Sequence, residues 1–237
     1  GIYYPQYSNK AIHSVEGRNL LYDYLEKKNI SYKKLGKLVL STNQNESKKL
    51  YDLFNRGKLN GVDDIRMLTI KQAKSMQNDL VIQEALYCPS TGIFDTADFI
   101  QSLEADIQAN GGIISFRSEV KDITIKSKQL FEINVKSENN FTLEAENIVN
   151  ACGLSSTNLA EKIDSLKNEL IPKSFFSKGH YFQLNGKHPF NNTLIYPINT
   201  NEGLGIHVTL DISGKVRFGP DTEWIEEIDY SFDKSRK

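Results

Sequence analysis

The sequence predicts a mixed α/β fold. Apolar residues recur at helical spacing in several segments of the first half, and residues that can cap a helix stand at the start of these segments. Short β-forming runs separated by polar turns follow in the second half. A chain of 237 residues is long enough for one large domain or two small ones, with a core that needs no disulfide or metal.

The first third of the sequence alternates helices and strands. Ser8 can cap the first helix, and Thr69 with Gln72 has the pattern of a capping box. Gly57 is typical of a helix C-terminus, and Pro89 stops a strand. The predicted elements are a helix over 8–28, a strand over 35–40, a helix over 45–57, a short helix from Thr69 and a strand over 85–87.

A helix followed by short strands makes up the middle third. Asp95 and Thr96 can cap the helix, which ends at Asn110-Gly111-Gly112. The predicted strands cover 113–116, 120–125, 131–135, 141–145 and 148–151, with the short polar separators of an antiparallel meander. The last of them is interpreted as a buried strand that leads through small residues into a helix start. Such a segment either lets a ligand approach closely or is a plain strand–helix turn.

The last third is predicted to be rich in β-structure. Its β runs cover 174–184, 193–198, 204–210 and 215–218, and the turns lie at Asn185-Gly186, Glu202-Gly203 and Ser213-Gly214. Gly203-Leu204-Gly205 supplies only the GxG of a nucleotide-binding GxGxxG fingerprint. Because this tripeptide stands between two strands, a hairpin turn is the better interpretation.

Composition and spacing argue against several classes of function. Lys plus Arg numbers 29 and Asp plus Glu 30, so the net charge of −1 lacks the basic excess of a nucleic-acid-binding protein. No apolar run approaches the roughly 18 residues of a membrane span, and we expect no signal peptide. The four histidines lack metal-ligand spacing, so we expect no metal site. Cys88 and Cys152 form no CxxC pair, which is typical of a reducing cytosol.

Nine short motifs occur in one order along the chain. They are Gly1-Ile2-Tyr3-Tyr4-Pro5, Val15-Glu16-Gly17-Arg18, Gly36-Lys37-Leu38, Thr91-Gly92-Ile93, Asn150-Ala151-Cys152-Gly153, Lys178-Gly179-His180-Tyr181, Ile195-Tyr196-Pro197, Gly203-Leu204-Gly205-Ile206-His207 and Phe218-Gly219-Pro220-Asp221. Together they resemble the FAD-dependent L-2-hydroxyglutarate dehydrogenase/oxidase family, within the D-amino-acid-oxidase-like flavoproteins. The resemblance implies part of that flavoprotein fold, with a mixed β-sheet substrate domain and an incomplete FAD-binding domain.

The resemblance also implies a division of the chain and a partner. A substrate-binding region would cover 1–90 and 165–237, and a partial FAD-binding region with a β-meander would cover 91–164. Family members begin with a dinucleotide-binding βαβ unit, and this chain is similar to their middle portion. The expected partner is a small-molecule 2-hydroxy acid. The missing βαβ unit is a separately encoded N-terminal FAD-binding piece and thus a second partner, or it is cut away or lost.

A cofactor site and a substrate site follow from the same resemblance. Glu119 and Val120 would lie near the adenine side of FAD, and Ala151, Cys152 and Gly153 would line the cofactor. Cys152 departs from the more usual alanine, and its thiol is read as a small apolar replacement. The substrate-binding candidates at matching positions are Tyr3, Tyr4, Lys178, Tyr181 and Tyr196.

His207 is predicted to be the catalytic base or the histidine that orients the substrate, because an imidazole titrates near neutral pH. The alternative is a histidine packed within a strand. Lys178 would hold a carboxylate or stand solvated at the start of a strand, and Tyr196 would reach the pocket or belong to the core. Arg18 and Arg217 are interpreted as surface or structural residues.

Three functions are consistent with the sequence. The first is FAD-dependent oxidation of a 2-hydroxy acid, with L-2-hydroxyglutarate converted to 2-oxoglutarate. The second is amine oxidation of the glycine- or sarcosine-oxidase type. The third is a non-catalytic remnant that cannot hold FAD alone, because the phosphate-binding loop is missing. We expect a cytoplasmic location, with peripheral attachment to the inner membrane as an alternative.

Overall fold

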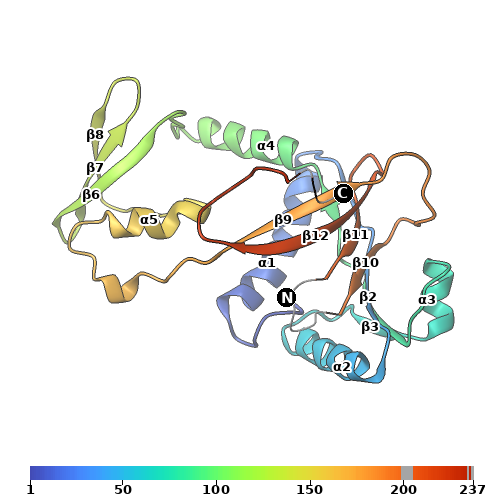
Figure 1. Ribbon diagram of the computed structural model, residues 1–237. Helices are drawn as coiled ribbons and strands as arrows, with labels where there is room; N and C mark the ends of the chain where they lie inside the picture. The colour runs from blue at the N-terminus through green and yellow to red at the C-terminus, as the bar shows by residue number, and fades with distance from the viewer. Residues whose placement is uncertain (199–204, 234, 236–237) are drawn as a thin grey trace. The chain divides into compact units, whose positions relative to one another are not determined.

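A seven-stranded mixed β-sheet is the framework of the larger part of the chain in the computed structural model (Figure 1). The strand order is β3-β4-β2-β10-β11-β12-β9. The strands span Arg66–Leu68 (β3), Glu84–Cys88 (β4), Lys37–Ser41 (β2), Leu194–Pro197 (β10), His207–Leu210 (β11), Val216–Ile225 (β12) and Phe176–Gln183 (β9). Strands β2 and β10 run parallel, and they join two antiparallel groups into one sheet.

The structure describes residues 1–198, 205–233 and 235. These residues form two compact units. The first unit comprises Gly1–Ala105, Ser177–Glu223 and Asp229–Lys237, and the second comprises Asp106–Phe176 and Trp224–Ile228. The division at 90 and 164 that the family resemblance implies stays a prediction.

Three helices of the first unit begin at side-chain caps, and the sequence predicts the caps of two of them. Helix α1 spans Asn9–Lys27, and the Ser8 side chain accepts a hydrogen bond from the Ala11 amide. Helix α2 spans Gln44–Leu59, and the short helix α3 spans Ile70–Met76. Thr69 and Gln72 form both halves of the predicted capping box. Each cap satisfies backbone amides that have no partner inside the helix, which explains why these starts are readable from the sequence.

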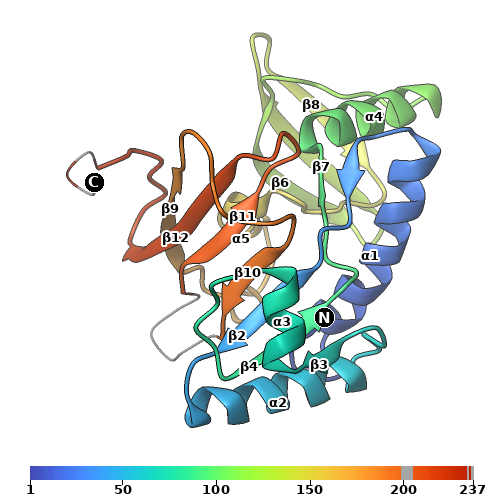
Figure 2. The same cartoon turned by 90° about the vertical axis from the view of Figure 1, so that its right-hand side faces the viewer.

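Strand β2 separates two hydrophobic cores because its side chains alternate between the faces of the sheet. On one face, Val39 and Leu86 pack with Leu50 and Leu53 of α2. On the other face, the fully buried Leu38 packs with other apolar residues that include Ala73 of α3. Figure 2 shows α3 close to β3 and β4. Burial on both faces explains the nearly continuous apolar run of this strand.

The prediction that Gly57 ends the second helix is wrong. Helix α2 continues to Leu59, and Asn60 is its C-cap. Gly57 is buried, and a Cβ atom there would collide with Ile65 and touch Ile2. The glycine therefore permits close packing of the helix on its neighbours, which is not visible in a local sequence pattern.

The second unit contains a three-stranded antiparallel meander, as predicted. Its strands span Glu119–Ser127 (β6), Leu130–Lys136 (β7) and Phe141–Ala145 (β8), and a short helix spans Ser156–Glu161 (α5). Helix α4 (Thr96–Ala109) precedes the meander, and the Asp95 side chain accepts hydrogen bonds from two amides of its first turn.

The remaining elements are short. Strands β1 (Tyr32–Lys33) and β5 (Ile93–Phe94) belong to the first unit, and the 3₁₀ turns η1 (Gly153–Ser155) and η2 (Asn168–Leu170) belong to the second.

Two predicted strands of this region are wrong. Residues 113–116 and 148–151 have no strand structure, and Ile113 and Val149 are 93% and 88% exposed. A β-forming run becomes a strand only where a neighbour pairs with its backbone, and no described residue pairs with either run. No helix among the described residues has the length and apolar character needed to cross a membrane.

Candidate active site

One face of the seven-stranded sheet carries a row of polar and aromatic side chains. Lys37 and Val39 lie on the same face of β2, and the parallel register places Tyr196 of β10 beside Val39. The pairing of Ile195 with Val208 brings Tyr196 next to His207 of β11. His207 is in turn opposite Gly219 of β12, so the row continues across four strands.

Aromatic contacts hold the centre of this row together. The rings of Tyr196 and His207 are stacked, with centroids 3.7 Å apart and planes at 4°. The Lys37 Nζ atom lies 5.1 Å from the Tyr196 ring centroid and 4.9 Å from the Tyr3 ring centroid, within the range of cation–π attraction. His207 is buried, as the packed-strand interpretation requires, and its ring is stacked on that of Tyr196. The structure therefore brings together the predicted residues Tyr3, Tyr196 and His207.

Lys37 is the cation of this row, and it is only 8% exposed. Burial lowers the pKa of its ammonium group from the ordinary value, because a charge loses its hydration in an apolar surrounding. The same burial raises the pKa of the Tyr3 and Tyr196 hydroxyls, with a smaller contribution from Tyr181 at Tyr196. In all three groups, burial shifts the pKa in the direction that favours the uncharged form.

Tyr181 lies at the end of the row because Gly219 has no side chain. A Cβ atom on Gly219 would stand 2.5 Å from the His180 carbonyl oxygen and 2.7 Å from the Tyr181 ring. The Gly219 φ angle of +151° is also a conformation that residues with a side chain rarely adopt. The bare backbone thus leaves room for the half-exposed Tyr181 ring next to the position of His207.

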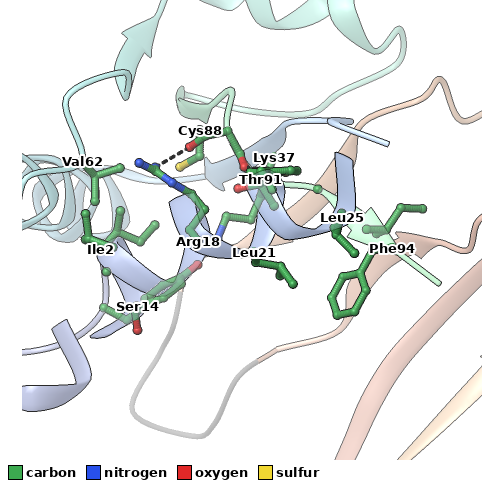
Figure 3. Close-up of a pocket in the computed structure, with 17 residues that line it drawn as sticks. Ile2, Ser14, Arg18, Leu21, Leu25, Lys37, Val62, Cys88, Thr91 and Phe94 are labelled. Atoms are coloured by element: carbon green, nitrogen blue, oxygen red, sulfur yellow. Dashed lines mark hydrogen bonds between the residues drawn. The ribbon is translucent and has the colours of Figure 1, made fainter. Parts of the chain in front are cut away.

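A cavity of about 270 Å³ adjoins Lys37 and Tyr3 (Figure 3). Helix α1 supplies Arg18, and the end of β4 with the following residues supplies Cys88 and Thr91. The remaining wall is largely apolar and includes Ile2, Val15, Leu21, Leu25, Val62, Ile93 and Phe94. Such a cavity lies at the lower end of the sizes that hold small organic ligands.

Two polar side chains of the cavity wall differ in charge: Arg18 is a cation with polar partners, and Cys88 carries an uncharged thiol at neutral pH. The Arg18 guanidinium donates a hydrogen bond of 2.7 Å to the Ser90 Oγ atom and lies 3.9 Å from the Asp64 carboxylate. Burial raises the pKa of the Cys88 thiol to about 11, so the thiol is protonated at neutral pH. The interpretation of Arg18 as a surface or structural residue is thus incomplete, because it is an ion-paired residue in the wall of a cavity.

Two predicted substrate residues lie away from the row. Lys178 forms an ion pair with Asp229 and contacts the Ser231 hydroxyl, so its charge is compensated by the chain itself. Tyr4 is partly exposed beneath the Lys10 ammonium, which lies 5.7 Å from its ring centroid. Neither residue is among those that line the cavity beside Lys37.

The predicted cofactor residues all belong to the second unit. Glu119 is exposed and paired with Lys121, and Val120 is half-buried in the same strand. Ala151, Cys152 and Gly153 form an exposed segment, and open space surrounds the position of a Gly153 side chain. This open surface of small residues fits one wall of an FAD site, and it supplies no cationic group for the phosphates.

The family comparison decides the identity of the fold. The family described as FAD dependent oxidoreductase (DAO) matches residues 1–236. The chain belongs to the DAO family. Its fold is accordingly a mixed α/β part of the DAO-like flavoprotein fold, as the sequence predicts.

Named relatives of this DAO chain include mitochondrial L-2-hydroxyglutarate dehydrogenases. The protein of Arabidopsis thaliana is 36% identical over 95% of this chain and 53% of its own length. The protein of Homo sapiens is 29% identical over 93% of this chain and 49% of its own length. The chain thus spans about half the length of the curated relatives it matches.

Solved DAO-like structures share the fold at low sequence identity. The L-alpha-glycerophosphate oxidase of Mycoplasma pneumoniae, solved with FAD bound, has a TM-score of 0.79 and 19% identity over 93% of this chain and 58% of that chain. Glycine oxidase of Geobacillus kaustophilus has a TM-score of 0.77 and 18% identity, over 98% of this chain and 60% of that chain. At these identities the likeness concerns the fold alone.

Sequence reasoning missed Lys37 as a site residue of this DAO chain. The signal was present, since Lys37 interrupts the apolar run Leu35–Leu40 and lysine is almost never fully buried without a partner. The part Gly203-Leu204 of the predicted hairpin turn lies outside the described residues. Among the residues that the structure describes, no group of three or more His, Cys, Asp or Glu side chains can hold a metal ion.

Proposed function

We propose that this chain forms the substrate-binding face of an FAD-dependent oxidoreductase that converts L-2-hydroxyglutarate to 2-oxoglutarate. The observation that carries the proposal is the stack of Tyr196 on His207, beside the buried ammonium of Lys37. Membership of the DAO family supports the redox chemistry, and the names of the relatives support the substrate.

The residues of the row have the chemistry that this oxidation needs. Oxidation of a secondary alcohol to a ketone removes the hydroxyl proton and the hydrogen on the same carbon, and FAD, when bound, supplies the acceptor for that second hydrogen. His207 takes the hydroxyl proton, because a neutral imidazole is a base near physiological pH. Tyr196 fixes the plane of this imidazole through the stack.

Aromatic side chains and low exposure keep water away from the same place. The Tyr3 and Tyr196 rings both lie close to the Lys37 ammonium, and His207 in the same row is buried. Exclusion of water strengthens the attraction between a fixed cation and an anionic substrate. The small residues Ala151, Cys152 and Gly153 would lie against the cofactor.

The test uses the protein tagged and purified from its own cells, together with any subunit that accompanies it. We expect a bound flavin whose absorbance is bleached under anaerobic conditions by L-2-hydroxyglutarate, and more slowly by the D-isomer or by glycine. In His207→Asn the rate of bleaching should fall by about 10²- to 10⁴-fold, the usual contribution of a general base. The exposed His13→Asn is the matched control.

Each alternative function has its own result in this experiment. Bleaching by glycine or sarcosine, with no response to L-2-hydroxyglutarate, would establish the amine oxidase. A preparation without flavin would establish the non-catalytic remnant. Equal rates for the His207 and His13 variants would remove His207 from the reaction.

A further inference from the structure

Lys37 is a buried cation that has no anionic partner among the residues that the structure describes. Its side chain has no hydrogen-bond acceptor and no carboxylate at ion-pair distance among the described residues, and its polar contacts are the two tyrosine rings. A cation–π contact attracts the charge but accepts none of the three ammonium hydrogens in a directed hydrogen bond. A buried lysine in this state is unusual, because desolvation of a charge is costly unless a partner compensates it.

We propose that Lys37 binds a carboxylate, and that the cavity beside it is the subsite for one end of a small aliphatic carboxylic acid. The identification of that acid with the substrate rests on the proposed function, whereas the binding of an anion does not. Lys37 lines both the cavity and, through the Tyr196 ring, the row that contains His207. The Tyr196 ring thus connects Lys37 with the predicted base, and neither Tyr196 nor His207 is among the residues that line the cavity.

The charges around the cavity favour one anion at Lys37. Arg18 is the other cationic side chain among the lining residues, and Asp64 and Ser90 already occupy its guanidinium. The neighbouring Cys88 is protonated at neutral pH, because burial raises the pKa of its thiol to about 11. An uncompensated positive charge therefore remains at Lys37.

The wall of the cavity defines the remainder of the ligand. Apolar side chains from α1 and from the loop before β3 surround most of the space, for example Leu21 and Val62. Such a surface suits a short hydrocarbon chain and disfavours a sugar or a phosphate, whose hydroxyls and oxygens would lose hydration without replacement. The volume of about 270 Å³ admits an acid of a few carbons.

The binding of glutarate to the whole chain tests this proposal. An N-terminally acetylated preparation prevents the Gly1 amine, which also lines the cavity, from adding a charge. By calorimetry we expect glutarate to bind and its uncharged diamide, glutaramide, to bind at least tenfold more weakly. In Lys37→Met the affinity for glutarate should fall by about 10- to 150-fold, the usual effect of losing a hydrogen bond to a charged group. Lys10→Met, which removes an exposed lysine over Tyr4, should have no effect.

A measurement on the unaltered chain keeps the proposal independent of the folding of the variant. In a preparation with ¹³C-labelled lysines, the pKa of Lys37 followed by NMR should rise when glutarate is added, because a bound carboxylate favours the charged ammonium. An unchanged Lys37 titration at saturating glutarate would overturn the proposal. Equal glutarate affinity of the Lys37→Met and Lys10→Met variants, or no binding by the chain at all, would overturn it as well.

The outcomes separate this inference from the proposed function. If glutarate binding depends on Lys37 while L-2-hydroxyglutarate fails to bleach the flavin, the subsite stands and the proposed reaction falls. If L-2-hydroxyglutarate bleaches the flavin equally fast in the wild type and in Lys37→Met, the reaction stands and the subsite falls.

Discussion

Replacement of Gly219 by alanine should strongly destabilise the first unit. The new Cβ atom would stand 2.5 Å from the His180 carbonyl oxygen and 2.7 Å from the Tyr181 ring, so either β9 or the ring must move. Crowding of this kind in a packed region costs about 1–3 kcal/mol. The φ angle of +151° adds about 1–3 kcal/mol for a residue with a side chain. We therefore expect Gly219→Ala to lower the free energy of unfolding by about 2–6 kcal/mol.

Gly214 provides a matched control for this prediction. It has a φ angle of +84°, but apart from Gly214 and its two chain neighbours no described residue has an atom within 4 Å of the position of its Cβ atom. Gly214→Ala should therefore lower the free energy of unfolding by only about 1–2 kcal/mol, the cost of the left-handed backbone conformation. Urea denaturation followed by far-ultraviolet circular dichroism measures both values. Equal destabilisation by the two substitutions would refute the reasoning that Tyr181 occupies space made free by Gly219.

Three further predictions concern the rest of the chain. At pH 8 a thiol reagent should modify the exposed Cys152 within minutes and the buried Cys88 only after unfolding. The Cys88 thiol, with a pKa of about 11, is ionised to only about one part in a thousand at this pH. Mass spectrometry measures the modification of each cysteine, and equal rates for the two would contradict the prediction. Hydrogen bonds from the Lys178 ammonium and from the Ser231 amide and hydroxyl lower the pKa of Asp229. The stabilising effect of this carboxylate is therefore present at neutral pH and is progressively lost as the pH falls below about 4. The melting temperatures of the wild type and Asp229→Asn should thus differ at pH 7, and the difference should shrink as the pH falls from 4 towards 2; a difference that stays constant over this range would count against the reasoning. Gly17→Ala, in an open part of α1, should raise the free energy of unfolding by about 0.5–1 kcal/mol, whereas Gly57→Ala should lower it because the new Cβ atom would collide with Ile65. Urea titrations measure both values. A stabilised Gly57→Ala variant would show that the Ile65 side chain can move aside without destabilising the core.

The parts of the fold that the sequence predicts correctly depend on neighbours along the chain. The Ser8 cap and the Thr69 capping box are hydrogen bonds between residues three apart, so the necessary information lies in a few letters. The strands of the meander are likewise connected by short turns, and each pairs with the next one. Residues 148–151 show the limit, because their β-forming composition needs a pairing strand that no described residue provides.

Which site residues can be predicted from the sequence also depends on how far apart their contacts lie along the chain. Tyr196 and His207 belong to neighbouring strands of the sheet, and family motifs were enough to select them together with Tyr3. The interrupted apolar run marks Lys37 locally, but its contacts with the Tyr3 and Tyr196 rings come from residues far away in the sequence and cannot be predicted from a local pattern. Lys178 illustrates the converse, since a lysine at a strand start gives no sign that Asp229 will neutralise it.

The most direct test of the account is the position of the bound acid on the protein. When 2-oxoglutarate is titrated into the isotopically labelled chain, we expect the largest NMR shift changes at Tyr3, in β2 at Lys37 and Val39, and in the strands of Tyr196 and His207. These residues share one face of the sheet and one cation. Shift changes confined to the second unit, or centred on Lys178, would contradict the account.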